Sequence, residues 1–209
     1  MNIEIISDVS CPWCIIGYQS LNSALIELDL QDSVVITWKP FELNANMPVE
    51  GQEISEHIQQ KYCATPEQSA ANRANIKARG KAVDYEFNFA DDGRIYNTFD
   101  AHRLIHWANK FGLQTKLKLA LFDLYFQQQG NPSDHQSLVE VAKGIGLDPI
   151  KAGEVLESGQ FTNEVRADMN TAQQQGIHSV PSFIFNNKLL VTGGHPKETF
   201  INVLGDFQK

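Results

Sequence analysis

The strand-like segments of this chain lie only at its two ends, and this constrains the fold more than any other feature. The first 43 residues read as strand, helix and strand. The two strands are the runs IEIISDV and SVVITWKPFEL, rich in β-branched and aromatic residues, and apolar residues at helical spacing separate them. Because a helix joins the two strands, they should be parallel with a right-handed crossover. We therefore expect the chain to begin with a βαβ unit.

The end of the chain carries the second set of strands. SFIFN and KLLVT read as two strands that turn at an Asn-Asn pair, which tolerates positive φ in a tight hairpin, and a last helix begins at Pro196. Helical patterns fill the middle of the chain. We therefore expect an α/β protein in two parts: a discontinuous domain of residues 1–43 and 176–209, and an all-helical insertion of residues 44–175.

Size, charge and hydropathy exclude several classes of protein. A chain of 209 residues, 42% hydrophobic and 20% charged, can bury a core without a disulfide or a metal. The net charge is −8 and the Lys and Arg residues form no run, so we expect no nucleic-acid partner. No stretch approaches the about 20 apolar residues of a membrane span. The first residues, MNIEIISDV, do not look like a secretory signal, so we expect a cytoplasmic protein.

Cys11 and Cys14 stand at the start of the first helix, with only Pro12 and Trp13 between them. Thiols in the cytoplasm are kept reduced, so a close pair there is more often catalytic or metal-binding than structural. A helix N-terminus offers free N–H groups and a partial positive charge, which stabilise a thiolate. We expect Cys11 to face solvent with a pKa below the ordinary cysteine value. Cys14, one turn further in, should be more buried and act as the resolving thiol.

Two other interpretations of the cysteine pair are a metal site and inert buried thiols. A structural zinc site needs four ligands, but the chain has no second Cys-x-x-Cys, and Cys63 stands alone as a bystander. His102 and His106 have i, i+4 spacing, but Arg103 stands where the hydrolytic zinc motif needs Glu. We therefore expect no metal and favour a redox-active pair over inert thiols.

Three segments of the chain together match a known pattern: CPWC after the first strand, the helical middle, and GIHSVPSFIFNN near the end. They resemble the DsbA-like branch of the thioredoxin superfamily. NTFDAHRLIHWA and TGGHPKE are closer still to its FrnE-type cytosolic members, relatives of 2-hydroxychromene-2-carboxylate isomerases and kappa-class glutathione transferases. The resemblance covers essentially the whole chain. It implies a thioredoxin fold, with Cys11 as nucleophile, Cys14 as resolving cysteine and Pro181 as a cis-proline beside them.

One position departs from the pattern of those relatives. Thioredoxin and DsbA carry a buried acid six residues before the first cysteine, where this chain has Ile5. The nearest carboxylate is Asp8. Asp8 is either a turn residue ahead of the helix or a group that moves the proton of Cys14.

Further residues are candidates for substrate binding. Pro12 and Trp13 lie at the tip of the dithiol loop, where Trp13 forms an apolar wall for substrate or packs on the insertion. Val180, held extended by the proline after it, can pair with a substrate strand. Asn97 contributes to the cleft or caps its helix. His195 follows two glycines and helps hold a peptide, as the resemblance implies, or belongs to a turn.

These residues predict a protein thiol–disulfide oxidoreductase or isomerase. The thiolate of Cys11 attacks a substrate disulfide and Cys14 resolves the mixed disulfide. We expect proteins or peptides with disulfides as partners, no bound cofactor, and glutathione as a candidate redox partner. The alternative is a glutathione-dependent isomerase or transferase of small aromatic substrates, although the resemblance implies serine at the first cysteine position in those relatives. A binding module with an idle dithiol is a third interpretation, and the oligomeric state is open.

Overall fold

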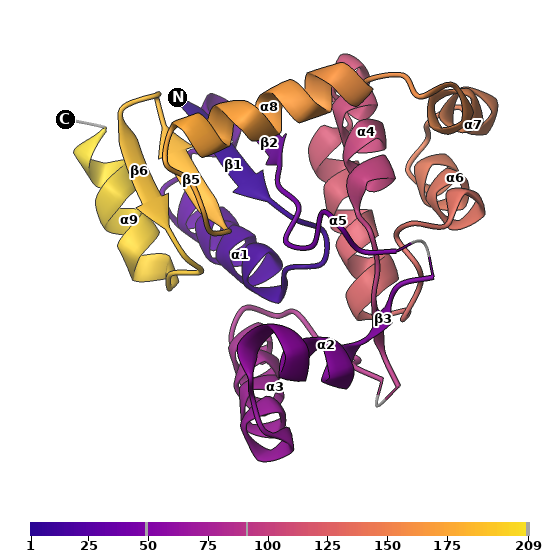
Figure 1. Cartoon of the computed structure of the whole chain (residues 1–209). Helices are drawn as coiled ribbons and strands as arrows, with labels where there is room; N and C mark the ends of the chain where they lie inside the picture. The colour runs from indigo at the N-terminus through magenta and orange to yellow at the C-terminus, as the bar shows by residue number, and fades with distance from the viewer. Residues whose placement is uncertain (49, 91, 208–209) are drawn as a thin grey trace.

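A four-stranded mixed sheet lies at the centre of the computed structural model, which describes residues 1–48, 50–90 and 92–207 (Figure 1). The strand order is β2-β1-β5-β6, with β1 and β2 parallel and the other pairs antiparallel. The strands are β1 (Asn2–Ser7), β2 (Val35–Pro40), β5 (Ser182–Phe185) and β6 (Leu189–Thr192). Strands from the two ends of the chain thus form one sheet, and the predicted parallel pair is confirmed.

β1 is the buried centre of this sheet. Ile3 pairs with Ile36 of β2 on one side and with Phe185 of β5 on the other, and its side chain is fully buried. β5 and β6 form the predicted hairpin. Asn186 and Asn187 make its turn at φ +49° and +54°, values that asparagine tolerates.

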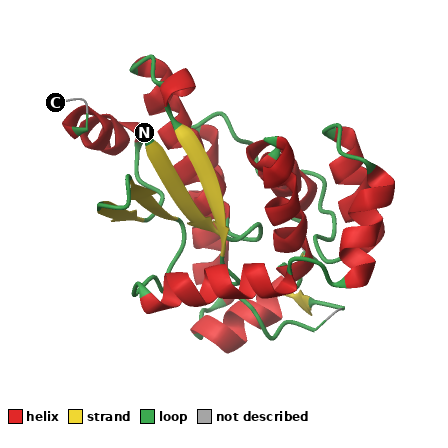
Figure 2. Ribbon diagram, turned by 90° about the horizontal axis from the view of Figure 1, so that it is seen from above, coloured by secondary structure: helices red, strands yellow, loops and turns green. Residues whose placement is uncertain are grey.

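Helices cover both faces of the sheet. α1 (Pro12–Glu27) and α9 (Lys197–Asp206) pack against each other, and α8 (Thr162–Gln174) and α5 (Gln114–Phe126) contact β2. Figure 2 shows α8 running across the sheet on the side away from α1. A short 3₁₀ helix, η1 (Gln31–Ser33), leads into β2.

The segment between β2 and β5 is helical, as predicted, with one exception. β3 (Gln52–Glu53) and β4 (Arg94–Ile95) form a short antiparallel ladder, so the insertion is not all-helical. Two-residue strands lack the alternating pattern by which longer strands are recognised. The remaining elements are α2 (Ile54–Tyr62), α3 (Pro66–Lys81), α4 (Phe99–Ala108), η2 (Asn109–Phe111), α6 (His135–Gly144) and α7 (Pro149–Ser158).

The insertion and the sheet share a continuous core. Trp38 of β2 connects them, since its ring lies 5.2 Å from that of Tyr18 on α1 and 6.2 Å from that of Phe122 on α5. The buried side chain of Gln114 pairs with the backbone of Trp38, accepting from its N–H at 2.9 Å and donating to its carbonyl at 3.1 Å. The insertion therefore covers the edge of β2, which would otherwise present unpaired backbone groups. No helix in the described part of the chain is both long and apolar enough to span a bilayer.

Candidate active site

The two cysteines lie where β1 leads into α1, at the N-terminus of the helix. Cys11 is the N-cap residue, with φ −96° and ψ 110°, and Pro12 begins the helix. The N–H of Cys14 donates to the carbonyl of Cys11 at 3.1 Å. The buried hydroxyl of Ser10 has no hydrogen-bond partner among the described residues, and the N–H of Ser10 donates to the carboxylate of Asp8 at 3.2 Å.

Both sulfurs are buried free thiols. Cys11 is 4% exposed and Cys14 is 0% exposed, so the expectation that Cys11 faces solvent is wrong. Its Sγ lies 3.7 Å from the carbonyl oxygen of Val180, which belongs to the segment preceding β5. The Val180–Pro181 peptide bond is cis. The fold therefore brings the Val180–Pro181 segment against the sulfur of Cys11, although the two are far apart in sequence, as the resemblance implies.

Two glycines allow three segments to meet beside the dithiol. A Cβ on Gly17 of α1 would lie 3.0 Å from Cζ of Phe183 and 3.2 Å from Cγ of Pro181. A Cβ on Gly194 would lie 3.0 Å from the carbonyl oxygen of Trp13. All three contacts are tighter than an ordinary van der Waals contact, so a side chain at either position would push the proline segment or the turn before α9 away from α1.

Asp8 is a buried anion that fixes the loop before Cys11. Its carboxylate accepts the N–H groups of Ser10 at 3.2 Å and Leu43 at 2.7 Å, and lies 3.7 Å from Nε2 of His102. Burial acts to raise the pKa of Asp8, but the nearby imidazole of His102 and the hydrogen bond from the Leu43 N–H outweigh it and the pKa is lowered. This geometry fits the role of a turn residue that ties the loop before α1 to the loop after β2.

His102 is the neutral neighbour of Asp8. Its Nε2–H donates to the carbonyl of Phe41 at 2.9 Å, and burial lowers the pKa of the imidazole below its ordinary value. His102 is therefore a hydrogen-bonded core residue, one of the two roles its helical position suggests.

Lys118 is the charged residue at this site that sequence reasoning missed. It projects from α5 with 1% of its surface exposed, and Nζ donates to the carbonyl of Ser7 at 3.4 Å. Nζ also lies 5.5 Å from the ring centroid of Trp38 and 5.0 Å from that of Phe122. Burial lowers the pKa of Lys118 to about 8, against the opposing effect of Cys14 and Asp8. The signal in the sequence is that a lysine interrupts an otherwise apolar helix face.

The two thiols titrate as a pair. Burial acts to raise the pKa of Cys14, but the hydrogen bond from Cys11 and the charge of Lys118 outweigh it, so this pKa is lowered. The hydrogen bond to Cys14 and burial raise the pKa of Cys11. The expected low pKa at Cys11 is therefore wrong, because the hydrogen bond to Cys14 and burial outweigh the effect of the helix N-terminus.

A model of the DSBA-like thioredoxin domain matches residues 2–205. The chain belongs to the DSBA-like thioredoxin domain family. A curated relative, the uncharacterized protein YwbO of Bacillus subtilis, is 24% identical over 210 residues, which cover 100% of this chain and 98% of YwbO.

Solved structures of this family and of related enzymes share the fold. A probable DsbA oxidoreductase of Streptomyces coelicolor is 32% identical with a TM-score of 0.91, over 99% of this chain and 89% of that one. A 2-hydroxychromene-2-carboxylate isomerase is 12% identical with a TM-score of 0.73, over 100% and 96%. The cytosolic disulfide reductase DsbM of Pseudomonas aeruginosa, solved with GSH, is 13% identical with a TM-score of 0.68, over 100% of both chains. The last two similarities concern the fold alone.

The other predicted residues of this DSBA-like chain are distributed unevenly around the dithiol. Trp13 is half-buried and packs on the core beside Gly194. His195 is half-buried, and its Nε2–H donates to the carbonyl of Thr192 at 2.9 Å, as a turn residue does. Asn97 accepts the N–H of Phe99 at 2.9 Å, but Thr98 is the N-cap residue of α4, so Asn97 lies one residue before the capping position.

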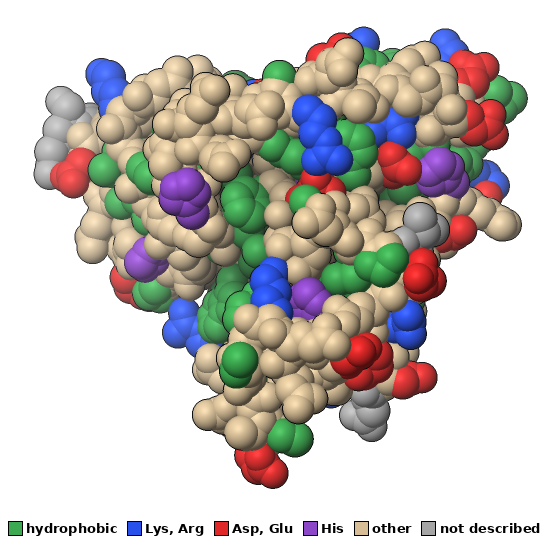
Figure 3. All heavy atoms as spheres, in the orientation of Figure 1, with side chains coloured by type: hydrophobic (Ala, Val, Ile, Leu, Met, Phe, Trp, Pro, Cys, Tyr) green, Lys and Arg blue, Asp and Glu red, His purple; other side chains and the backbone are tan. Residues whose placement is uncertain are grey.

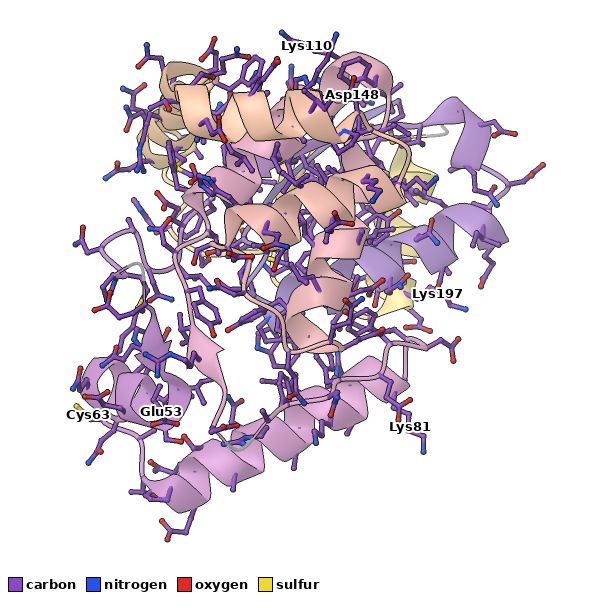
Figure 4. The ribbon with its side chains drawn as sticks, turned by 90° about the vertical axis from the view of Figure 1, so that its right-hand side faces the viewer. Glu53, Cys63, Lys81, Lys110, Asp148 and Lys197 are labelled. Carbon is purple, nitrogen blue, oxygen red and sulfur yellow. The ribbon has the colours of Figure 1, made fainter. Side chains whose placement is uncertain are left out.

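Cys63 lies apart from the dithiol. It ends α2 in a left-handed conformation and is exposed, and Figure 4 shows it at the outer edge of that helix. No group of three His, Cys, Asp or Glu side chains within the described residues is arranged to hold a metal ion.

Proposed function

We propose that this protein is a thiol–disulfide oxidoreductase that exchanges disulfides of proteins or peptides through Cys11 and Cys14. The observation that carries the proposal is the contact of 3.7 Å between Sγ of Cys11 and the carbonyl of Val180, at the N-terminus of α1. Family membership and the 32% identity to a probable DsbA oxidoreductase support the same chemistry.

Cys11 is the sulfur that attacks substrate. It is the less buried of the pair, and it lies against the extended backbone before β5, where a substrate chain can add as a strand. The two thiols share a proton, and when this proton lies on Cys14 the sulfur of Cys11 is the thiolate. We assign Pro181 to the site as the residue that holds the Val180 carbonyl beside this sulfur, and the half-buried Pro12 and Trp13 as the side of the loop that meets substrate.

The reaction proceeds through two exchanges. The thiolate of Cys11 attacks one sulfur of the substrate, the substrate S–S bond breaks, and the departing thiolate takes a proton from solvent. Cys14, deprotonated, then attacks Sγ of Cys11 and releases the second substrate sulfur, which is also protonated. The substrate gains two electrons and two protons, and the enzyme is left with a Cys11–Cys14 disulfide. Two molecules of a small thiol such as glutathione return it to the dithiol.

Reduction in a cytoplasmic compartment is the direction that we propose. DsbM, which shares the fold, is a cytosolic disulfide reductase and was solved with GSH. A reducing compartment would keep the resting pair as the dithiol, the form that attacks disulfides.

We further propose that the insertion, residues 44–175, selects the substrate. α3 contacts α1, and Nη2 of Arg79 donates to the carbonyl of Gly194 at 3.5 Å, beside Trp13. Figure 3 shows hydrophobic side chains, with basic ones beside them, where the α2–α3 pair meets the rest of the molecule. This surface suits an extended peptide with apolar side chains.

The test is reduction of insulin by the full-length protein with glutathione, beside a glutathione-conjugation assay on a small aromatic electrophile. We expect insulin reduction and no conjugation. Conjugation without insulin reduction would favour the transferase alternative instead. If Cys11→Ser keeps the activity of the wild type, the dithiol takes no part in the mechanism.

Cys14→Ser should accumulate mixed disulfides with substrate or glutathione, whereas Cys11→Ser should form none. If the two variants behave alike, the order of the two cysteines is wrong.

A further inference from the structure

Lys118 is an ammonium group in the core without a carboxylate partner. It is 1% exposed, and none of the carboxylates in the described ranges lies within 4 Å of its Nζ. Its only hydrogen bond there is the one at 3.4 Å to the carbonyl of Ser7. The effective penalty for burying a charge is several kcal/mol unless an opposite charge compensates it. A negative charge other than a paired carboxylate should therefore compensate Lys118.

One side of Lys118 offers no negative charge. There the side chain borders a cavity of about 10 Å³, the size that one water fills. The cavity is lined by Trp38, Lys39, Pro40, His102, Ile105, His106 and Lys118. The ionisable groups among them are basic. Asp168, an acid beside this lining, pairs with Lys39 at 3.0 Å and lies 3.9 Å from His106.

The other side of Lys118 holds the dithiol and Asp8. The carboxylate of Asp8 is already bound by two backbone N–H groups and faces His102. Of the charges that act to hold the proton on Lys118, that of Cys14 is the largest, ahead of Asp8 and Cys11. In return, the charge of Lys118 is one of the causes that lower the pKa of Cys14. Ser7 contacts Lys118 through its carbonyl, and its side chain is one of the causes that lower the pKa of Cys14.

We propose that Lys118 is the counter-charge of the dithiol, a positioning residue that stabilises the anionic reduced pair and thereby sets the redox equilibrium of the proposed oxidoreductase. The disulfide form carries no charge, so Lys118 has this partner only in the reduced protein. The insertion therefore contributes to the chemistry as well as to the substrate surface, because Lys118 belongs to α5 of the insertion.

Lys118→Met separates this role from a structural one. Met keeps the length of the side chain but removes its charge, and loss of a nearby opposite charge raises the pKa of a thiol by about one unit or more. We expect the equilibrium constant against glutathione to shift about tenfold toward the protein disulfide, equivalent to about 30 mV for two electrons. No carboxylate in the described ranges lies within 4 Å of the Lys118 ammonium, so methionine leaves no buried carboxylate unpaired and the variant should fold.

The pH dependence of this shift has a definite sign. The effect needs a thiolate on the pair and a proton on Lys118, so it is present above the first pKa of the pair. It fades as the pH falls through that value, because both thiols are then neutral. It also fades above about pH 8, where Lys118 loses its proton. Asp8 remains an anion throughout this range, and His102 remains neutral in its upper part.

The experiment equilibrates the full-length protein with glutathione buffers at a series of pH values and measures the disulfide fraction by alkylation and mass spectrometry. Lys116→Met is the matched control, since it is exposed on the same helix. We expect wild-type equilibrium in the control, and a shift in Lys118→Met confined to the pH window above. A variant within twofold of wild type at every pH, or one shifted equally in acid, would overturn the proposal.

A second measurement needs only the wild-type protein. The Nζ resonance of Lys118, followed by NMR against pH, should show a lower pKa in the disulfide form than in the dithiol form, since the thiolate is then absent. Equal titration in both forms would refute the counter-charge role. Neither measurement requires turnover, so a wild-type protein that fails to reduce insulin would overturn the proposed function without deciding this inference.

Discussion

Replacing Gly17 by alanine tests how closely α1 must approach the proline segment. An added Cβ would lie 3.0 Å from Cζ of Phe183, 3.2 Å from Cγ of Pro181 and 3.3 Å from Cα of Gly194. The optimal separation of two carbon atoms is about 3.5–4.0 Å. All three neighbours, which form the wall of the dithiol, must therefore move by several tenths of an ångström.

The magnitude follows from two opposing effects. Alanine is favoured over glycine in a helix interior by about 1 kcal/mol. Forcing a methyl group into a packed site costs about 1–3 kcal/mol. Gly153 of α7 is the matched control, because a Cβ there meets nothing within 4 Å and gains the helix preference alone. The free energies of unfolding of the two variants should therefore differ by about 2 kcal/mol, or roughly 4–8 °C in Tm.

Two assays check this prediction. Thermal unfolding should place Gly153→Ala above wild type and Gly17→Ala at or below it. Alkylation of Cys11, which is only 4% exposed, should be faster in Gly17→Ala because the segment that covers the sulfur has moved, whereas insulin reduction should be slower. Equal stability of the two variants, with unchanged alkylation, would show that the close approach of α1 to Pro181 constrains nothing.

Two further substitutions test the residues around the dithiol. Trp13→Ala should raise KM for a peptide disulfide roughly tenfold, because about 1.5 kcal/mol of apolar contact is lost. Reduction of a very small disulfide should stay nearly unchanged. Equal losses on both substrates would mean that Trp13 does not touch substrate. Asp8→Asn should lower the free energy of unfolding by about 1–3 kcal/mol at neutral pH, since the N–H groups of Ser10 and Leu43 lose a charged acceptor. The lowered pKa of Asp8 stabilises the fold above the carboxyl's unfolded value of about 3.9, and this contribution is lost as the pH falls through the folded value. Urea unfolding at neutral and acid pH should therefore show the difference between the Asp8→Asn variant and wild type shrinking in acid, and a constant difference would contradict a charged Asp8.

Local patterns were sufficient for the elements of the sheet and for the position of the dithiol. The Asn186–Asn187 turn, the strands on either side of it and the helix that begins at Pro12 each depend on a few neighbouring residues. The meeting of Val180–Pro181 with Cys11 could be expected only from the family resemblance, since no local rule joins positions so far apart in the chain.

The charges and burial at the dithiol were decided by the tertiary structure. Cys11 sits at a helix N-terminus, which by itself predicts an exposed sulfur with a low pKa, yet the Val180 segment buries it and its hydrogen bond to Cys14 keeps the proton on Cys11. In sequence Lys118 only interrupts an apolar helix face, and it is the packing of α5 on β2 that brings its Nζ to Ser7. A pKa depends on the dielectric and on every charge nearby, and those neighbours come from distant parts of the chain.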